Sequence, residues 1–331
     1  MIPLSQRAGQ SEAWSQDLAD AVTDVRALLA RLGLRGDDVD LDPRFPVRVP
    51  LPFLERMRPG DPNDPLLRQV LPLAIENDHV PGYVDDPLEE AVAERSPGLI
   101  QKYRGRALLI ATPTCAVHCR YCFRREFPYG AHQQDVSFPS LAVVEGDPSI
   151  SELILSGGDP LMLKDAVLGR LVARLDRIAH LARLRIHTRL PVVIPRRVTP
   201  ALVDMLRGSR LRVVVVLHVN HPNEIGGDLP DALRRLAGSG CTLLNQSVLL
   251  AGVNDDEDVL VDLSERLFAH GVLPYYLHLA DAVRGTAHFD VGSARATALM
   301  ESIARRLPGY LVPRLAREVP GLPYKEIVAS T

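Results

Sequence analysis

The sequence "TPTCAVHCRYCFRRE" (residues 112–126) contains three of the chain's four cysteines, spaced C-x3-C-x2-C: Cys115, Cys119 and Cys122. It directly follows the apolar run "ALLIAT" (residues 107–112), so we expect a loop that begins where a β-strand ends. Cysteines this close together, in a chain with so few others, indicate a metal centre rather than a disulfide framework. These three thiols are therefore the candidate metal ligands.

Two kinds of metal centre suit three clustered thiols. A structural zinc ion would need a fourth ligand, such as His118 or a distant residue, and such sites usually use two separate C-x2-C pairs. Only one such pair is present here. A [4Fe–4S] cluster held by three thiolates leaves one iron free, as a catalytic centre requires. The spacing favours the cluster and leaves zinc open. Cys241 stands alone and is expected to be a small buried residue.

Short apolar runs recur after residue 105 and alternate with amphipathic stretches such as residues 165–181 and 255–270. The runs expected to be strands are residues 107–112, 152–156, 184–188, 212–219, 242–250 and 273–279. The first connection, "VSFPSLAVVEGDPS" (residues 136–149), is a poor helix. Apolar strands alternating with helices predict a parallel sheet, and six units are too few for a closed eight-stranded barrel. The predicted fold is α/β, a partial (β/α)6 TIM-like barrel over residues 101–306.

Two further segments flank this predicted barrel. Residues 1–100 predict a helical and proline-rich extension, with helix candidates at residues 11–34, where Ser11 is the expected N-cap, and at residues 64–77. Residues 307–331 form a short, proline-rich C-terminal tail. We expect this tail to close the mouth of the barrel.

Polar residues gather where the predicted strands end. After the cysteine loop come "SGGDP" (156–160), "HTRLP" (187–191), "HVNHPNE" (218–224), "NQS" (245–247) and "HLAD" (278–281). Parallel α/β sheets and barrels place their sites at the carboxyl ends of the strands. The pattern therefore favours an enzyme over a structural protein.

The overall composition excludes several other classes of protein. The 331 residues carry a net charge of −3, so there is no general basic field to hold nucleic acid or an anionic membrane. No apolar run is long enough to span a bilayer, and the N-terminus lacks the apolar core of a signal peptide. We expect a soluble cytoplasmic protein that binds neither nucleic acid nor membrane.

The cysteine spacing after the first strand of a partial barrel is similar to that of the radical S-adenosylmethionine (SAM) superfamily. In that superfamily a glycine-rich segment after the second strand meets the methionyl amino group of SAM, and "SGGDP" stands at that place. Glycine permits a close backbone approach there. In the superfamily the open iron binds SAM, which is split into methionine and a 5′-deoxyadenosyl radical. The resemblance implies a [4Fe–4S] cluster and SAM as cofactors.

Over about residues 100–325 the chain resembles one family of that superfamily, the lysine 2,3-aminomutases. The matching stretches are "CRYCFRR", "LILSGGDPL", "TRLPVVIPRRVTP", "HVNHPNEI", "LLNQSVLLAGVND", "LPYYLHLAD" and "GYLVPRLARE". These isomerases use pyridoxal phosphate (PLP) to carry an amino group from Cα to Cβ by a radical route. The resemblance implies that Cys115, Cys119 and Cys122 bind the cluster. The residues it implies for SAM are Ser156, Gly157, Gly158, Asp159, His218 and Gln246, with Asn245 beside them.

The amine that holds PLP has few candidates, because lysine occurs only at Lys102, Lys164 and Lys325. Lys325 stands where the family has its Schiff-base lysine, which is both catalytic and cofactor-binding. Lys102 and Arg106 stand where the family has basic residues near the PLP phosphate, and Lys164 is expected to be a surface charge. The family has a glycine run before its lysine, whereas this chain has "PGLPYK" with the single glycine Gly321.

The resemblance also implies a substrate site. Arg124 stands where the family has a carboxylate-binding arginine, and a guanidinium fork suits a carboxylate. Asp281 matches one of two acids that bind the ε-ammonium group of lysine. Glu318 stands at the second acid position, where the family has aspartate.

The chain ends six residues after Lys325, whereas clostridial-type enzymes of the family extend well past that lysine. The short C-terminus and the stretches "YLHLADAVRGTAHF" and "LVPRLARE" together resemble the enzymes of the family that serve elongation factor P. Such enzymes convert (S)-α-lysine to (R)-β-lysine, which a separate ligase attaches to elongation factor P. The implied partners are L-lysine, that ligase, elongation factor P, and a reductant such as flavodoxin.

Other functions stay open at this point. An aminomutase could act on glutamate or arginine, although two acids facing the distal end of the substrate do not suit glutamate. A non-catalytic iron–sulfur or zinc-binding protein would also use the clustered thiols. The arginines of "RYCFRRE" make a radical SAM enzyme acting on RNA conceivable, but no broad basic face or aromatic stacking motif supports it.

Overall fold

The computed structural model describes residues 13–129 and 135–328, so the expected N-cap Ser11 lies outside the described residues. The described chain forms a ten-stranded sheet in which neighbouring strands follow chain order. The strands are β1 (Glu94–Ser96), β2 (Leu99–Tyr103), β3 (Arg106–Thr112), β4 (Glu152–Gly157), β5 (Arg183–Thr188), β6 (Arg212–Leu217), β7 (Thr242–Val248), β8 (Leu273–His278), β9 (Arg314–Arg317) and β10 (Glu326–Ile327).

The central strands β3 to β9 run parallel to one another, whereas β1, β2 and β10 pair antiparallel at the two sides. Strands β3 to β8 are the six that the sequence predicts. The order ends at β1 and β10, so the sheet of the described residues is open, which agrees with a partial barrel. The seventh parallel strand, β9, lies in the tail, where no strand was predicted. Strand pairing thus continues across the expected boundaries at residues 100 and 306.

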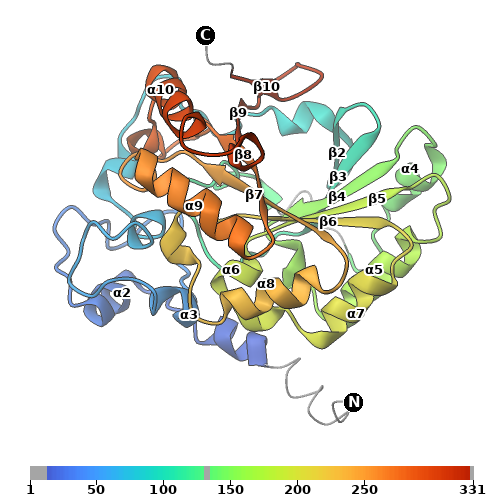
Figure 1. The fold of residues 1–331 in the computed structure, drawn as a ribbon, viewed down its shortest axis with the longest axis horizontal. Coiled ribbons are helices and arrows are strands. Elements are labelled where there is room, and N and C mark those ends of the chain that lie inside the picture. Colours follow the sequence, from blue (N-terminus) through green and yellow to red (C-terminus); the bar gives the residue numbers. More distant parts are fainter. Residues whose placement is uncertain (1–12, 130–134, 329–331) are drawn as a thin grey trace.

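Helices fill the connections between the parallel strands, and further short helices precede β1. The α-helices are α2 (Val25–Leu32), α3 (Leu51–Leu54), α4 (Leu141–Gly146), α5 (Asp165–Leu175), α6 (Leu190–Val193), α7 (Pro200–Gly208), α8 (Leu229–Ala237), α9 (Glu257–Ala269) and α10 (Ser293–Ala304). Short 3-10 helices are η1 (Leu67–Gln69), η2 (Ala74–Asn77), η3 (Glu90–Ala93), η5 (Pro160–Met162), η6 (Pro195–Arg197), η7 (Pro222–Glu224), η8 (Ala287–Phe289) and η9 (Gly309–Leu311). Figure 1 shows α5, α7, α8, α9 and α10 arranged in an arc around the strands.

The long helices form because each has one apolar face to bury. Helix α5 buries Leu168, Leu171, Val172 and Leu175, which recur at helical spacing and pack against the sheet. Every residue of β4 is buried, as expected for a parallel strand covered on both faces. The first connection contains only the six-residue α4, in agreement with its weak helical pattern. No helix within the described ranges has the length and apolar character to cross a membrane.

The helix predictions in the N-terminal segment were partly wrong. Residues 64–77 form η1 and η2 instead of one helix, because Pro72 between them lacks the N–H that a continuous helix needs. The candidate at residues 11–34 contains a helix at 13–19 and then α2. Asp24 is the N-cap of α2, since its side chain accepts a hydrogen bond from Ala27 N at 2.7 Å.

Candidate active site

A cavity of about 660 Å³ is lined by side chains from β3, β4, β5, β7 and β8, the cysteine loop and the C-terminal tail. With the exception of Asn245, the residues that the sequence predicts for the cluster, SAM, PLP and substrate line this cavity. They are Cys115, Cys119, Cys122, Ser156, Gly157, Gly158, Asp159, His218, Gln246, Lys102, Arg106, Lys325, Arg124, Asp281 and Glu318. The structure thus gathers them around one space, while their separate roles stay predictions. Asn245 does not line the cavity; its side chain bonds to the backbone of Val219.

The N-terminal segment holds the cysteine loop in place. Arg48 Nη1 donates to the carbonyl oxygen of Cys115 at 3.1 Å, and Arg120 N donates to the carbonyl oxygen of Gln69 at 2.8 Å. The Arg120 guanidinium also binds both carboxylate oxygens of Glu76, at 3.0 and 3.1 Å from Nε. Both side chains of that ion pair are almost completely buried, so its geometry is well fixed.

The donor set of the loop fits a cationic centre. The three thiols are free and face the cavity, where burial raises the pKa of Cys115 and raises that of Cys122 to about 11. Each thiolate would also repel the others, which raises both pKa values further. A bound metal centre supplies the positive charge that keeps such thiols deprotonated. The residues therefore fit an iron–sulfur cluster.

The geometry does not favour a single zinc ion. Among the described residues, no three His, Cys, Asp or Glu side chains converge closely enough to bind one metal ion. A cluster distributes its thiolates over several irons and does not need such convergence. His118, the nearby candidate for a fourth zinc ligand, has Nδ1 2.9 Å from the carbonyl oxygen of Pro46.

The two glycines of "SGGDP" allow β4 to approach the start of the cysteine loop. A Cβ atom on Gly157 would lie 2.5 Å from the carbonyl oxygen of Thr112, and φ at this residue is +123°. A Cβ atom on Gly158 would lie 2.3 Å from the carbonyl oxygen of Thr114. No other residue type fits at either position. The glycines therefore fix the cysteine loop against β4, a role the sequence did not reveal.

Asp159 connects the end of β4 to the end of β5. Its buried carboxylate accepts hydrogen bonds from Thr188 Oγ1, Arg189 N and Leu190 N, each at 2.8 Å. Burial raises the pKa of Asp159, and these donors partly offset that effect. The carboxylate is thus engaged in positioning the residues after β5.

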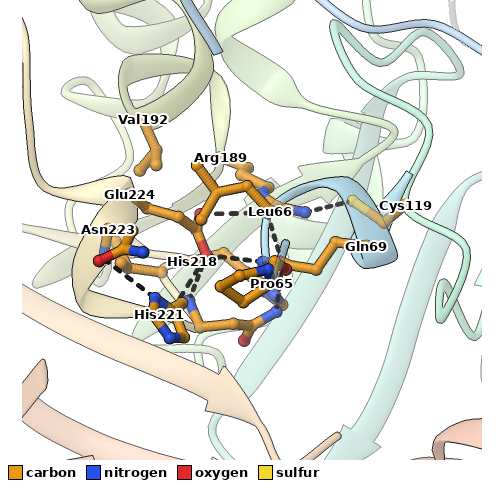
Figure 2. A network of polar contacts seen from close by, with 12 residues as sticks. Pro65, Leu66, Gln69, Cys119, Arg189, Val192, His218, His221, Asn223 and Glu224 are labelled. Atoms are coloured by element: carbon orange, nitrogen blue, oxygen red, sulfur yellow. Dashed lines mark hydrogen bonds and ion pairs between the residues drawn. The ribbon is translucent and has the colours of Figure 1, made fainter. Parts of the chain in front are cut away.

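Arg189 is the centre of a buried network beside the cysteine loop (Figure 2). Its Nη1 donates to Cys119 Sγ at 2.8 Å and to the Tyr121 hydroxyl at 2.6 Å. Its Nη2 donates to Gln69 Oε1 at 2.7 Å and to Glu224 Oε2 at 3.0 Å. The network connects the N-terminal segment, the cysteine loop and the ends of β5 and β6.

His218, which follows β6, lies beside that network. Its Nε2 is 2.9 Å from the Tyr121 hydroxyl, and burial lowers the pKa of His218 to about 3. The ring is therefore neutral at physiological pH, and it is one of the residues that line the cavity.

The predicted PLP lysine, Lys325, meets the predicted substrate acid Glu318 within the C-terminal tail, and Lys102 of β2 pairs with the same acid. Lys325 Nζ donates to Glu318 Oε2 at 2.5 Å, and Lys102 Nζ donates to Glu318 Oε1 at 2.9 Å. Burial alone would raise the pKa of Glu318, but the two lysines lower it to about 2. Burial raises the pKa of Asp281 to about 7, against the effect of Lys325. At neutral pH Glu318 is therefore ionised, whereas Asp281 is only partly ionised.

Arg124 has a buried partner that the sequence did not identify. Its Nε and Nη2 donate to Glu90 Oε2 and Oε1 at 2.7 and 2.8 Å. Its Nη1 donates to Ser156 Oγ at 3.1 Å and to the carbonyl oxygen of Gly157 at 3.3 Å. Glu90 raises the pKa of Arg124 in spite of burial, so this arginine remains charged.

Comparison with known proteins identifies the family. The chain is 44% identical to the L-lysine 2,3-aminomutase of Haemophilus influenzae, over 100% of this chain and 99% of that one. It is 47% identical to that of Escherichia coli, over 95% and 94% of the two chains. The chain belongs to the lysine 2,3-aminomutase family. The enzyme of Clostridium subterminale is 38% identical, over 81% of this chain and 65% of that one.

Two other comparisons add little to this result. No protein-family model matches the chain. Among solved structures, SuiB of Streptococcus suis bound to SAM has a TM-score of 0.48 and 12% identity, over 66% of this chain and 51% of that one.

Membership of the lysine 2,3-aminomutase family confirms the predictions of family and enzyme class. The chain is an isomerase, and the family's cofactors, a [4Fe–4S] cluster, SAM and PLP, come with that membership. The alternative of a non-catalytic iron–sulfur or zinc-binding protein is therefore wrong. Four residues of the site, Gln69, Glu90, Arg189 and Glu224, carry no motif that marks them in the sequence. The last two lie in the quoted strand-end stretches, whereas Gln69 and Glu90 lie in the N-terminal segment, where no strand-end pattern marks them.

Proposed function

We propose that this member of the family is a radical SAM, PLP-dependent 2,3-aminomutase that converts (S)-α-lysine to (R)-β-lysine. The observation that carries the proposal is that Cys115, Cys119, Cys122 and Lys325 line one cavity of about 660 Å³. A reactive radical must reach the substrate without meeting water, so its source and the substrate need one enclosed space. When bound, the cluster and SAM supply a 5′-deoxyadenosyl radical, and PLP stabilises the radical on the amino acid.

The first group of residues would hold the cluster and SAM. Three thiols on a fixed loop leave one iron without a protein ligand, which is the position a chelating amino acid can take. Next to the loop, Ser156, Gly157 and Gly158 supply a hydroxyl and accessible backbone at the end of β4. The neutral ring of His218 and the amide of Gln246 offer hydrogen bonds from the other strands.

The second group would hold PLP. Lys325 is the amine for the covalent link, and Gly321 before it has φ +79°, so the single glycine takes a left-handed conformation in that loop. Arg106 is a cation for the phosphate: it lies over the Tyr103 ring at 4.5 Å and makes no ion pair within the described ranges. Lys102 is bound to Glu318, so it reaches a phosphate only after that ion pair opens.

The third group would bind the substrate by charge. The Arg124 guanidinium suits its carboxylate, and Asp281 and Glu318 suit a cationic group at its distal end. Two acids at that end support lysine as the substrate and oppose glutamate, whose distal carboxylate they would repel.

We further propose that the β-lysine serves elongation factor P, in a cytoplasmic reaction with a flavodoxin-like reductant and a separate ligase as partners. Support comes from the resemblance of "YLHLADAVRGTAHF" and "LVPRLARE" to the enzymes of that branch. A ligase assay tests this role: β-lysine made by this protein should become attached to elongation factor P, and α-lysine should react poorly by comparison.

Product analysis tests the main proposal. The protein is reconstituted without oxygen with iron, sulfide, PLP, SAM and reductant, and supplied with α-lysine. β-Lysine should form, and it should disappear in the Cys119→Ala and Lys325→Ala variants. Cys241→Ala and Lys164→Ala are matched controls outside the cavity and should keep the activity. SAM cleavage to 5′-deoxyadenosine without β-lysine would contradict lysine as the substrate, while retaining the radical chemistry.

A further inference from the structure

A buried arginine donates directly to one of the predicted cluster ligands. Arg189 follows β5, and its Nη1 lies 2.8 Å from the sulfur of Cys119 (Figure 2). The side chain of Arg189 is only 7% exposed, so little water competes for this contact. Membership of the family does not by itself assign a role to Arg189. The thiol that Arg189 contacts, Cys119, is one of the three on the cysteine loop.

The position of the guanidinium is fixed from several sides. Glu224 and Gln69 accept from Nη2, and the Tyr121 hydroxyl accepts from Nη1. The guanidinium also lies over the Phe53 ring, 5.3 Å from its centroid. A donor held in this way needs no reorganisation to meet a negative sulfur, which is the condition for a strong electrostatic effect.

Glu224 is itself held rigidly. Its side chain is completely buried, and Oε1 accepts from the backbone N–H groups of Asn220 at 2.9 Å and His221 at 3.1 Å. The carboxylate cannot turn away without breaking these bonds, so it orients Arg189 and balances its charge. Arg56 donates to the backbone carbonyl of Glu224 and adds a second cation to this buried region.

The physical consequence concerns the electron that the cluster must accept. Hydrogen bonds to cluster sulfurs, and positive charge near them, stabilise the reduced state and raise the reduction potential. We propose that Arg189 is a positioning residue that acts through Cys119: it donates an N–H to the thiolate and raises the potential at which the cluster is reduced. This inference rests on the proposed assignment of a [4Fe–4S] cluster to the three cysteines.

A redox titration of the reconstituted full chain, followed by electron paramagnetic resonance without SAM, tests the inference. In Arg189→Met the potential should become more negative than in the wild type. In Arg189→Lys the shift should be smaller, because the charge stays while the fork of N–H groups is lost. Arg197→Met is the matched control: Arg197 is fully buried and paired with Asp165 at 2.7 Å, but it does not line the cavity.

The Arg197→Met control separates a change in the reduction potential of the cluster from a general loss of stability. Arg197→Met should lower the melting temperature without moving the potential. Equal potentials in the wild type and in Arg189→Met would overturn the inference, whatever the change in stability. A wild-type protein that binds no iron–sulfur cluster would instead overturn the cluster assignment, and with it the proposed function.

A measurement on the wild-type protein covers the case in which Arg189→Met does not fold. The chain is produced with isotopically labelled arginine, and the reduced cluster is examined by electron–nuclear double resonance. A coupling from the arginine label, with an exchangeable proton that disappears in heavy water, is the expected result. Absence of any arginine coupling in a sample with a fully reduced cluster would contradict the proposed hydrogen bond.

Discussion

The carboxylate of Glu318 lies 2.5 Å from the amine of Lys325, and its other oxygen lies 2.9 Å from the amine of Lys102. One acid therefore holds both lysines that the sequence assigns to PLP. The same acid is a candidate for binding the ammonium group of the substrate. On the proposed roles, Lys325 would hold PLP in the resting enzyme and would then no longer supply the same ammonium charge, which would leave Glu318 open to another cation.

Replacing Glu318 by glutamine tests this dual role. Glu318→Gln keeps the size of the side chain but removes its charge, so we expect KM for lysine to rise about tenfold, with a smaller change in kcat. Steady-state production of β-lysine at saturating PLP measures both. Glu326→Gln is the control, because Glu326 pairs with Arg317 near the surface and does not line the cavity. An unchanged KM would mean that Asp281 alone binds the ammonium group.

Asp281 should make the stability of the protein without cofactors depend on pH. Burial raises its pKa to about 7 in the folded state, with Lys325 lowering and Glu318 raising it, whereas an unfolded aspartate has a pKa of about 4. Between these values the folded state binds more protons than the unfolded state. The free energy of unfolding therefore falls as pH rises from about 4 to about 7.

Asp281→Asn should remove this pH-dependent fall in the free energy of unfolding. At pH 8 we expect the variant to be more stable than the wild type by on the order of 4 kcal/mol, because the folded and unfolded pKa values differ by about three units, each worth about 1.4 kcal/mol. Near pH 4 the difference should fall to well below about 1 kcal/mol. Urea unfolding of the protein without cofactors, at a series of pH values, measures the effect. Asp262→Asn, on the exposed face of α9, should leave the pH dependence unchanged. Parallel pH profiles for the wild type and Asp281→Asn would contradict a raised pKa for Asp281.

Much of the fold follows from the sequence because the decisive signals are local. Six parallel strands are apolar runs of the right length between amphipathic stretches, and each was predicted within a few residues. Strand β9 (Arg314–Arg317) was missed because it is short and lies among prolines, and only its pairing with β8 makes it a strand. The helix predicted at 64–77 failed for a local reason, since Pro72 interrupts it.

The candidate site also contains residues that the sequence predicts and residues that only the tertiary structure reveals. Residues that match family motifs, such as Cys119 and Lys325, could be named from the sequence, and the structure gathers them around one cavity. Glu90 and Gln69 could not, because their partners are 34 and 120 residues away in the chain, at Arg124 and Arg189. Such ion pairs and hydrogen bonds depend on tertiary packing, which no local pattern records.

The buried pair of Glu90 and Arg124 gives the last prediction. Both side chains are 5% exposed, and two hydrogen bonds join them, so removing one charge leaves the other buried without its counter-ion. We expect Glu90→Gln to lower the free energy of unfolding by about 3 kcal/mol, as measured by urea unfolding. Glu145→Gln is the control, since Glu145 pairs with Arg174 in a more exposed position and should change stability little.

The pair can also be tested for a role in substrate binding by a double-mutant cycle of Glu90→Gln and Arg124→Met. If Glu90 only neutralises Arg124, the double variant should regain much of the stability lost in Glu90→Gln. If Glu90 also orients the guanidinium for the carboxylate of lysine, KM should rise in Glu90→Gln and should not recover in the double variant. Recovery of stability together with wild-type KM would contradict the assignment of Arg124 to the substrate, because the double variant lacks that guanidinium.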